Sequence, residues 1–94
     1  MSEVLTYKAD ERVDTRTVEK FSQELKDILD KGQYDLEIDM SDTVYISSVG
    51  LRVLLSTQKE IDKHGGSMVI KKTGPAVKKV FEVTGFIRLF RIED

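Results

Sequence analysis

Two hydrophobic periodicities alternate along this chain, and this alternation limits the folds that the chain can adopt. Some segments carry apolar residues at every second position, as a strand with one buried face does. Others carry them at every third or fourth position, as an amphipathic helix does. The order of these segments is β-α-β-α-β-α-β with short connections. We therefore predict one α/β domain over residues 1–94, a length too short for two domains.

The strand predicted over residues 34–40 indicates how the sheet is covered. Leu36, Ile38 and Met40 alternate strictly with Glu37 and Asp39. A central strand with helices on both of its faces would be apolar throughout. We therefore expect a mixed sheet with helices mainly on one face, while the other face stays in contact with water.

The other elements follow from the same periods and from the residues that start and stop helices. Strands are expected at residues 3–9, 67–71 and 86–92. Helices are expected from an N-cap at Asp14 or Thr15 to Gly32, from Ser47 or Ser48 to Lys63, and from Gly74-Pro75 to Gly85. The apolar stripe of the second helix is expected to contain Leu51, Leu54, Leu55, Gln58 and Ile61.

Composition and charge argue against several kinds of protein. The chain has no cysteine, so it offers neither disulfide bonds nor thiolate chemistry. Its 15 basic and 17 acidic residues give a net charge of −2, which argues against a broad nucleic-acid surface. The longest apolar run, near residues 49–55, is far shorter than the roughly 20 residues of a membrane span. The N-terminus lacks the features of a signal peptide, so a cytoplasmic protein without a membrane partner is expected.

Enzyme chemistry is not predicted. The one histidine, His64, ends a helix beside Lys63, where the helix dipole favours a cation. Without cysteine or a second histidine, the usual zinc ligand sets are missing. Gly65-Gly66 ends a helix and lacks the Lys-Ser/Thr of a phosphate-binding loop. Ser48-Val49-Gly50 matches only half of a Gly-x-Ser-x-Gly nucleophile motif. No cofactor and no metal are therefore expected.

Two serines interrupt an apolar run at the start of the second helix, in the stretch VYISSVGLRVLL. One serine is enough to cap a helix, because its hydroxyl accepts a hydrogen bond from an N–H group of the first turn. The second serine could carry a phosphate, which the amides and the dipole of a helix N-terminus favour. Val49 and Gly50 are expected to leave that hydroxyl uncovered. Capping alone and phosphorylation both remain open from the residues themselves.

The stretch LEIDMSDTVYISSVGLRVLL, residues 36–55, resembles the central motif of the STAS domain of bacterial anti-sigma factor antagonists. That motif contains Asp-Ser-Ser/Thr/Ala-Gly-Leu, and the serine after the aspartate is phosphorylated. Matching Gly50-Leu51 to its Gly-Leu puts Ser48 on the phosphoacceptor and Ser47 on the aspartate. The segment HGGSMVIKKTGPAVKKVFEVTGFIRLFRIED also resembles the family, and Asp14 falls where the family has an acidic residue entering the first helix.

This sequence departs from the family pattern at three places. Ser47 replaces the aspartate before the phosphoacceptor, and Glu11 stands near a position where the family often has glycine. The N-terminal segment has room for one strand, where many members have a hairpin. The resemblance nevertheless covers nearly the whole chain.

The resemblance implies an anti-sigma factor antagonist that switches partners and is not an enzyme. When unphosphorylated, the surface around Ser48 would bind an anti-sigma factor that is itself a serine kinase. Phosphate on Ser48 would release that partner, and a serine phosphatase would restore binding. The neighbourhood of the phosphosite, which would also contact the partner, consists of Asp14, Ser47, Val49, Gly50, Leu51 and Arg52.

Two alternatives stay open. One is a STAS scaffold in a signalling or transport complex that is never phosphorylated, which the change at Ser47 favours. The other is a module that senses a small ligand such as a nucleotide. Neither alternative involves direct contact with nucleic acid.

Overall fold

Four parallel strands form the main sheet of this protein. The computed structural model describes residues 3–93. The sheet has the order β1-β3-β5-β6, made of β1 (Leu5–Lys8), β3 (Asp35–Asp39), β5 (Ser67–Lys71) and β6 (Arg91–Glu93). The helices are α1 (Val18–Asp30), α2 (Ser48–Lys63) and α3 (Pro75–Thr84). The predicted β-α-β-α-β-α-β order is confirmed. No helix within the described residues is both long and apolar enough to cross a membrane.

The expectation of a mixed sheet is wrong. Every pair of neighbouring strands in residues 3–93 runs parallel. Each neighbouring pair in the main sheet is joined through a helix, and such a crossover returns the chain in its original direction. A second, two-stranded sheet pairs β2 (Arg12–Val13) with β4 (Tyr45–Ile46). The sequence did not reveal it, because two residues are too few to show a period.

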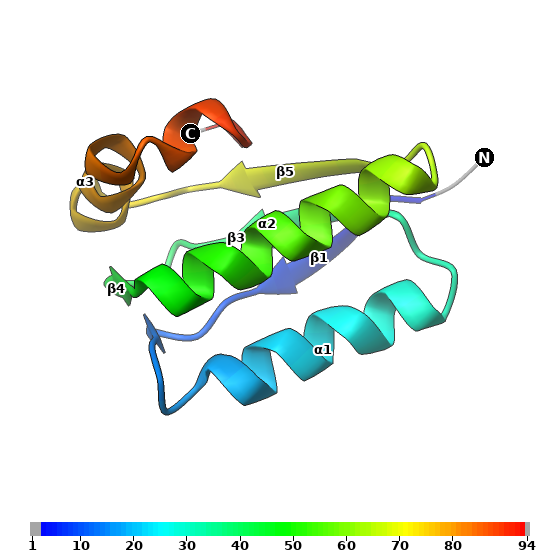
Figure 1. Ribbon diagram of the computed structural model, residues 1–94, viewed down its shortest axis with the longest axis horizontal. Helices are drawn as coiled ribbons and strands as arrows, with labels where there is room; N and C mark the ends of the chain where they lie inside the picture. The colour runs from blue at the N-terminus through cyan, green and yellow to red at the C-terminus, as the bar shows by residue number, and fades with distance from the viewer. Residues whose placement is uncertain (1–2, 94) are drawn as a thin grey trace.

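The helices α1 and α2 lie over one face of the sheet (Figure 1). Leu36 and Ile38 of β3 point to that face and are almost completely buried. Between them, Glu37 points to the other face, where its Oε1 lies 2.6 Å from the Nζ of Lys71 on β5. The prediction that one face of the sheet stays in contact with water is therefore confirmed.

The helix α1 begins later than predicted. Its N-cap is Thr17, not Asp14 or Thr15. Asp14 opens a turn before the helix, in which its carboxylate accepts from the Arg16 N–H at 3.0 Å and its carbonyl accepts from the Val18 N–H at 2.8 Å. Aspartate forms such turns readily because its short side chain bonds the backbone two residues on.

The buried side of α2 also differs from the expected stripe. Leu51, Leu54 and Ile61 are buried as predicted, whereas Leu55 and Gln58 are only half-buried. Thr57 is buried in their place, with 6% of its surface exposed. Its hydroxyl donates to the Val53 carbonyl at 2.8 Å, so burial leaves no polar group unpaired.

The last predicted strand, residues 86–92, is only partly right. Phe86–Arg88 form a 3-10 helix, η1, before the short strand β6. This turn brings the ring of Phe90 to 6.1 Å from Phe86 and to 5.8 Å from Phe81 in the core. Aromatic packing therefore overrides the tendency of this apolar segment to form a strand.

Candidate functional site

The first turn of α2 gives the two serines different roles. Ser47 is the N-cap, and its Oγ accepts from the Gly50 N–H at 3.4 Å. Its own N–H donates to the Val13 carbonyl at 2.8 Å, which ties the cap to β2. Ser48 is the first helical residue and is exposed, and no group within residues 3–93 bonds its hydroxyl. Capping therefore accounts for Ser47 and leaves the Ser48 hydroxyl accessible.

Gly50 has a packing role that the sequence did not indicate. It is buried, and a Cβ at this position would lie 2.7 Å from Val13 Cγ1 and 2.9 Å from Ile46 Cγ1. Ser48 is exposed, as expected, and Gly50 is in addition needed for the helix to approach β2 and β4. Leu51 is also buried, with 1% of its surface exposed. Both residues hold the turn in place, and neither offers a side chain to a partner.

Asp14 lies beside this turn because of the small sheet. Val13 pairs with Ile46 in that sheet, and its carbonyl then accepts from Ser47. The N–H of Arg16, and then the guanidinium of Arg12, hold the pKa of Asp14 below its ordinary value of 3.8. A carboxylate that is ionised at neutral pH therefore stands next to the serine turn.

The structure adds two residues that the sequence analysis missed. The Arg12 guanidinium lies 4.7 Å from the centre of the Tyr45 ring, and its Nε is 3.4 Å from Asp14 Oδ2. Arginine and tyrosine are frequent anchors of protein interfaces. No local pattern could have found them, since β2 and β4 lie far apart in the sequence.

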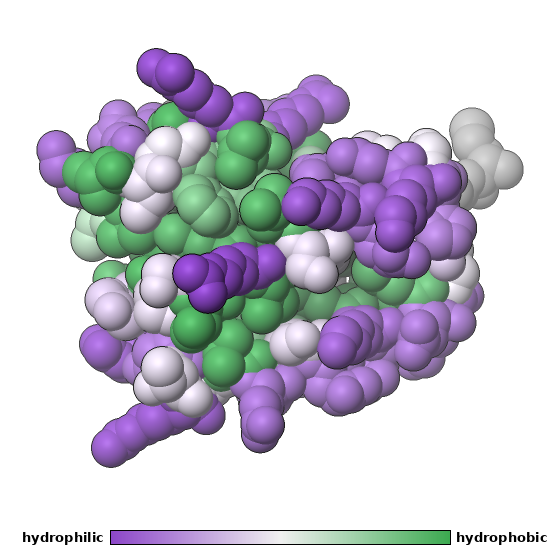
Figure 2. All heavy atoms as spheres, viewed as in Figure 1, coloured by the Kyte–Doolittle hydropathy of each residue, from purple (hydrophilic) through white to green (hydrophobic). Residues whose placement is uncertain are grey.

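Exposed apolar side chains adjoin the serine turn. Val44 and Tyr45 are 54% and 40% exposed, and Val49 is half-buried. Figure 2 shows apolar side chains gathered on the side of the molecule where α2 begins, with hydrophilic ones around them. An apolar patch with a polar rim is typical of a protein-binding surface. The residues of this serine-turn surface are Val44, Tyr45, Ser48, Val49 and Arg52.

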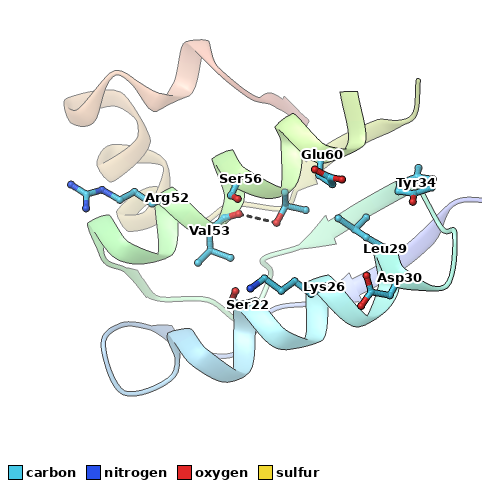
Figure 3. A pocket seen from close by; sticks show the side chains of 10 residues that line it. Ser22, Lys26, Leu29, Asp30, Tyr34, Arg52, Val53, Ser56 and Glu60 are labelled. Carbon is cyan, nitrogen blue, oxygen red and sulfur yellow. Dashed lines mark hydrogen bonds between the residues drawn. The ribbon is translucent and has the colours of Figure 1, made fainter. Parts of the chain in front are cut away.

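A groove of about 410 Å³ runs between α1 and α2 (Figure 3). Its walls carry apolar side chains, small hydroxyls and charges of both signs. Arg52 and Lys26 lie nearer to the end where α2 begins, and Asp30 and Glu60 lie nearer to the other end. No local sequence pattern indicates this groove, because its walls come from two helices and from Tyr34. Its lining consists of Ser22, Lys26, Leu29, Asp30, Tyr34, Arg52, Val53, Ser56, Thr57 and Glu60.

Comparisons with known sequences indicate the family of this chain. The chain matches the family model of the STAS domain over residues 2–94. The protein BtrV of Bordetella bronchiseptica, named as an anti-sigma factor antagonist, is 35% identical over 82 residues. That match covers 87% of this chain and 71% of the relative.

Solved structures share the fold. A crystal structure described as an anti-sigma factor antagonist of Thermotoga maritima gives a TM-score of 0.90 at 24% identity, covering 97% of this chain and 79% of the other. The Bacillus protein SpoIIAA matches all of this chain at 16% identity in two forms. Its unphosphorylated form gives a TM-score of 0.75 over 82% of that chain. Its phosphorylated form gives 0.73 over 86%.

Proposed function

The chain belongs to the STAS domain family, and we propose that it is an anti-sigma factor antagonist controlled by phosphorylation of Ser48. In this proposal the unphosphorylated protein binds an anti-sigma factor through its serine-turn surface. That partner is also the serine kinase that modifies Ser48, and a serine phosphatase reverses the modification. The protein acts by binding in the cytoplasm and has no catalytic role.

One observation carries this proposal. Ser47 supplies the cap of α2, so the exposed hydroxyl of Ser48 has no structural task within residues 3–93. A hydroxyl at the start of a helix is a favourable place for a phosphate, because the N–H groups and the dipole of the helix stabilise the added charge. Phosphorylation there would cost the fold little.

The same charge would weaken a protein complex. A phosphate adds close to two negative charges in the middle of the serine-turn surface. A partner packed against Val44 and Tyr45 would have to remove water from that charge or face it directly. A loss of about 3 kcal/mol in binding free energy would lower the affinity more than a hundredfold.

We expect Ser48→Asp to bind its anti-sigma factor kinase about tenfold to hundredfold more weakly than the unmodified protein does. Asp introduces a negative charge at the same place without changing the helix cap. Isothermal titration calorimetry would measure both dissociation constants. Ser41→Asp is the matched control, since Ser41 is also exposed but lies in the loop after β3. Equal affinity of Ser48→Asp and the unmodified protein would refute the proposed switch.

A scaffold that is never phosphorylated remains the second candidate, favoured by Ser47 in place of the family aspartate. Intact-mass analysis after incubation with ATP and the kinase separates the two. One added phosphate that is lost only in Ser48→Ala supports the switch, with Ser47→Ala as the control. No added phosphate, from a kinase active on another substrate, supports the scaffold.

A further inference from the structure

Two contacts hold the side chain of Arg12 in one orientation. Its guanidinium lies over the ring of Tyr45, 4.7 Å from the centre of that ring. Its Nε donates a hydrogen bond to Asp14 Oδ2 at 3.4 Å. These groups meet because Arg12 and Tyr45 are direct partners in the pairing of β2 with β4. A guanidinium that is stacked on a ring and bonded at one edge is already oriented before a partner binds.

The other edge of this guanidinium is free to bind. Its terminal Nη nitrogens bond no group within residues 3–93, and the side chain of Arg12 is 56% exposed. The N–H groups of an arginine form a fixed fork that matches the two oxygens of a carboxylate. Because Asp14 already balances the charge of Arg12, the fork would act through short hydrogen bonds and not through long-range attraction.

Exposed apolar side chains stand beside this fork. Val44 and Tyr45, which belong to the serine-turn surface, follow one another in the chain and are 54% and 40% exposed. The strand β4 lies at the end of the molecule where α2 begins (Figure 1). An arginine and a tyrosine next to apolar contacts are a frequent combination at the centre of a protein interface. This arrangement fits a partner that presents a carboxylate next to an apolar side chain.

We propose that Arg12 binds a carboxylate of the anti-sigma factor through two parallel hydrogen bonds. An apolar side chain of the same partner packs on Val44 and Tyr45. Asp14 and the ring of Tyr45 are positioning residues, because they hold the fork in its binding orientation in the free protein. Little side-chain entropy is then lost when the pair forms. This inference rests on the proposed function and names the chemistry of its partner.

Substitutions of Arg12 test the fork. We expect Arg12→Gln to weaken binding of the anti-sigma factor kinase about tenfold to thirtyfold, measured by isothermal titration calorimetry without ATP. Arg12→Lys should weaken it at least about fivefold, because lysine keeps the charge but lacks the fork. Arg16→Gln is the matched control and should change the affinity less than about twofold, since Arg16 is exposed and forms no ion pair within the described residues. Circular dichroism would check that each variant is folded.

A double-mutant cycle tests the positioning by Tyr45. Tyr45→Leu keeps an apolar side chain but removes the ring on which the guanidinium lies. We expect it to weaken binding about fivefold when Arg12 is present and less than about twofold when Arg12 is already replaced by Gln. Additive effects of the two substitutions would overturn the positioning role of Tyr45.

The inference and the proposed function fail in different ways. If Ser48→Asp weakened binding while Arg12→Gln did not, the proposed function would stand and the carboxylate site would be wrong. Full affinity of Arg12→Lys would also overturn the fork, since a positive charge alone would then suffice. If the Arg12 variants weakened binding while Ser48→Asp bound as tightly as the unmodified protein, the carboxylate site would stand and the proposed switch would fail. A kinase that did not bind the unmodified protein at all would overturn both.

Discussion

Ser47 and Ser48 are adjacent in the chain, but their hydroxyls have different roles. Ser47 has extended backbone and accepts from the first turn, as an N-cap does. Ser48 is already helical, and its hydroxyl faces solvent. A single step along the backbone therefore separates a residue that caps the helix from an exposed residue whose hydroxyl has no bonding partner within residues 3–93.

At the residue scale, the two serines should differ in their effect on stability. We expect Ser47→Ala to lower the free energy of unfolding by about 0.5–1 kcal/mol, because the Gly50 N–H loses its acceptor. Ser48→Ala should stay within about 0.5 kcal/mol of the unmodified protein. Urea unfolding followed by circular dichroism measures both. A larger loss for Ser48→Ala would show that its hydroxyl has a structural role.

At the scale of elements, the small β2–β4 sheet decides where α2 begins. The N–H of Ser47 bonds β2, and the buried Gly50 lets the helix rest on Val13 and Ile46. The same sheet brings Asp14 and Arg12 next to the serine turn. The geometry of the serine turn therefore depends on four strand residues that come from two distant parts of the chain.

Gly50→Ala tests this close contact. Alanine is a better helix former than glycine by up to about 1 kcal/mol, yet its Cβ would lie 2.7 Å from Val13 Cγ1. We expect the steric cost to dominate, with a net loss of about 1–2 kcal/mol in the free energy of unfolding. Ser56→Ala, at an exposed position of α2, is the control and should be nearly neutral. A stabilised Gly50→Ala protein would contradict the packing seen here.

At the scale of the whole molecule, the uncovered face of the sheet has no second layer of helices. Ion pairs and hydrogen bonds between side chains of neighbouring strands stabilise it instead. Glu37 of the central strand β3 accepts from Thr6 on β1 at 2.9 Å and pairs with Lys71 on β5. Lys71, and then Thr6, lower the pKa of Glu37 from its ordinary value of 4.5. The ionised carboxylate is thus favoured by the folded state.

This shift has a definite sign for stability. A carboxyl whose pKa is lower in the folded state stabilises the fold above its unfolded pKa, and the effect is lost as the pH falls through the folded value. We expect the melting temperature to fall as the pH is lowered below about 4.5. The share of this fall in melting temperature that comes from Glu37 should be missing in Glu37→Gln. This variant should therefore lose less stability on acidification than the unmodified protein.

Differential scanning calorimetry between pH 7 and pH 3 would measure this difference. Glu82→Gln is the matched control, since Glu82 is exposed on α3 and forms no ion pair within residues 3–93. Identical acid sensitivity of Glu37→Gln and the unmodified protein would show that the ion pair does not contribute.

The sequence by itself determined the order of the elements, the single covered face of the sheet and the exposed serine at the start of α2. These features depend on local periods and on capping chemistry, which neighbouring residues express without reference to the rest of the chain. The alternation of Leu36, Ile38 and Met40 with Glu37 and Asp39 is one example. The motif around Gly50-Leu51 was also local, and it identified Ser48 as the candidate phosphoacceptor.

Only the tertiary structure decided the pairing of β2 with β4, the contact of Arg12 with Tyr45 and the groove between α1 and α2. It also showed why residue 66 is glycine, since a Cβ there would lie 1.9 Å from the Tyr34 carbonyl oxygen. Each of these features joins segments that are far apart in sequence. Their geometry is set by how the helices pack on the sheet, and no local pattern carries that information.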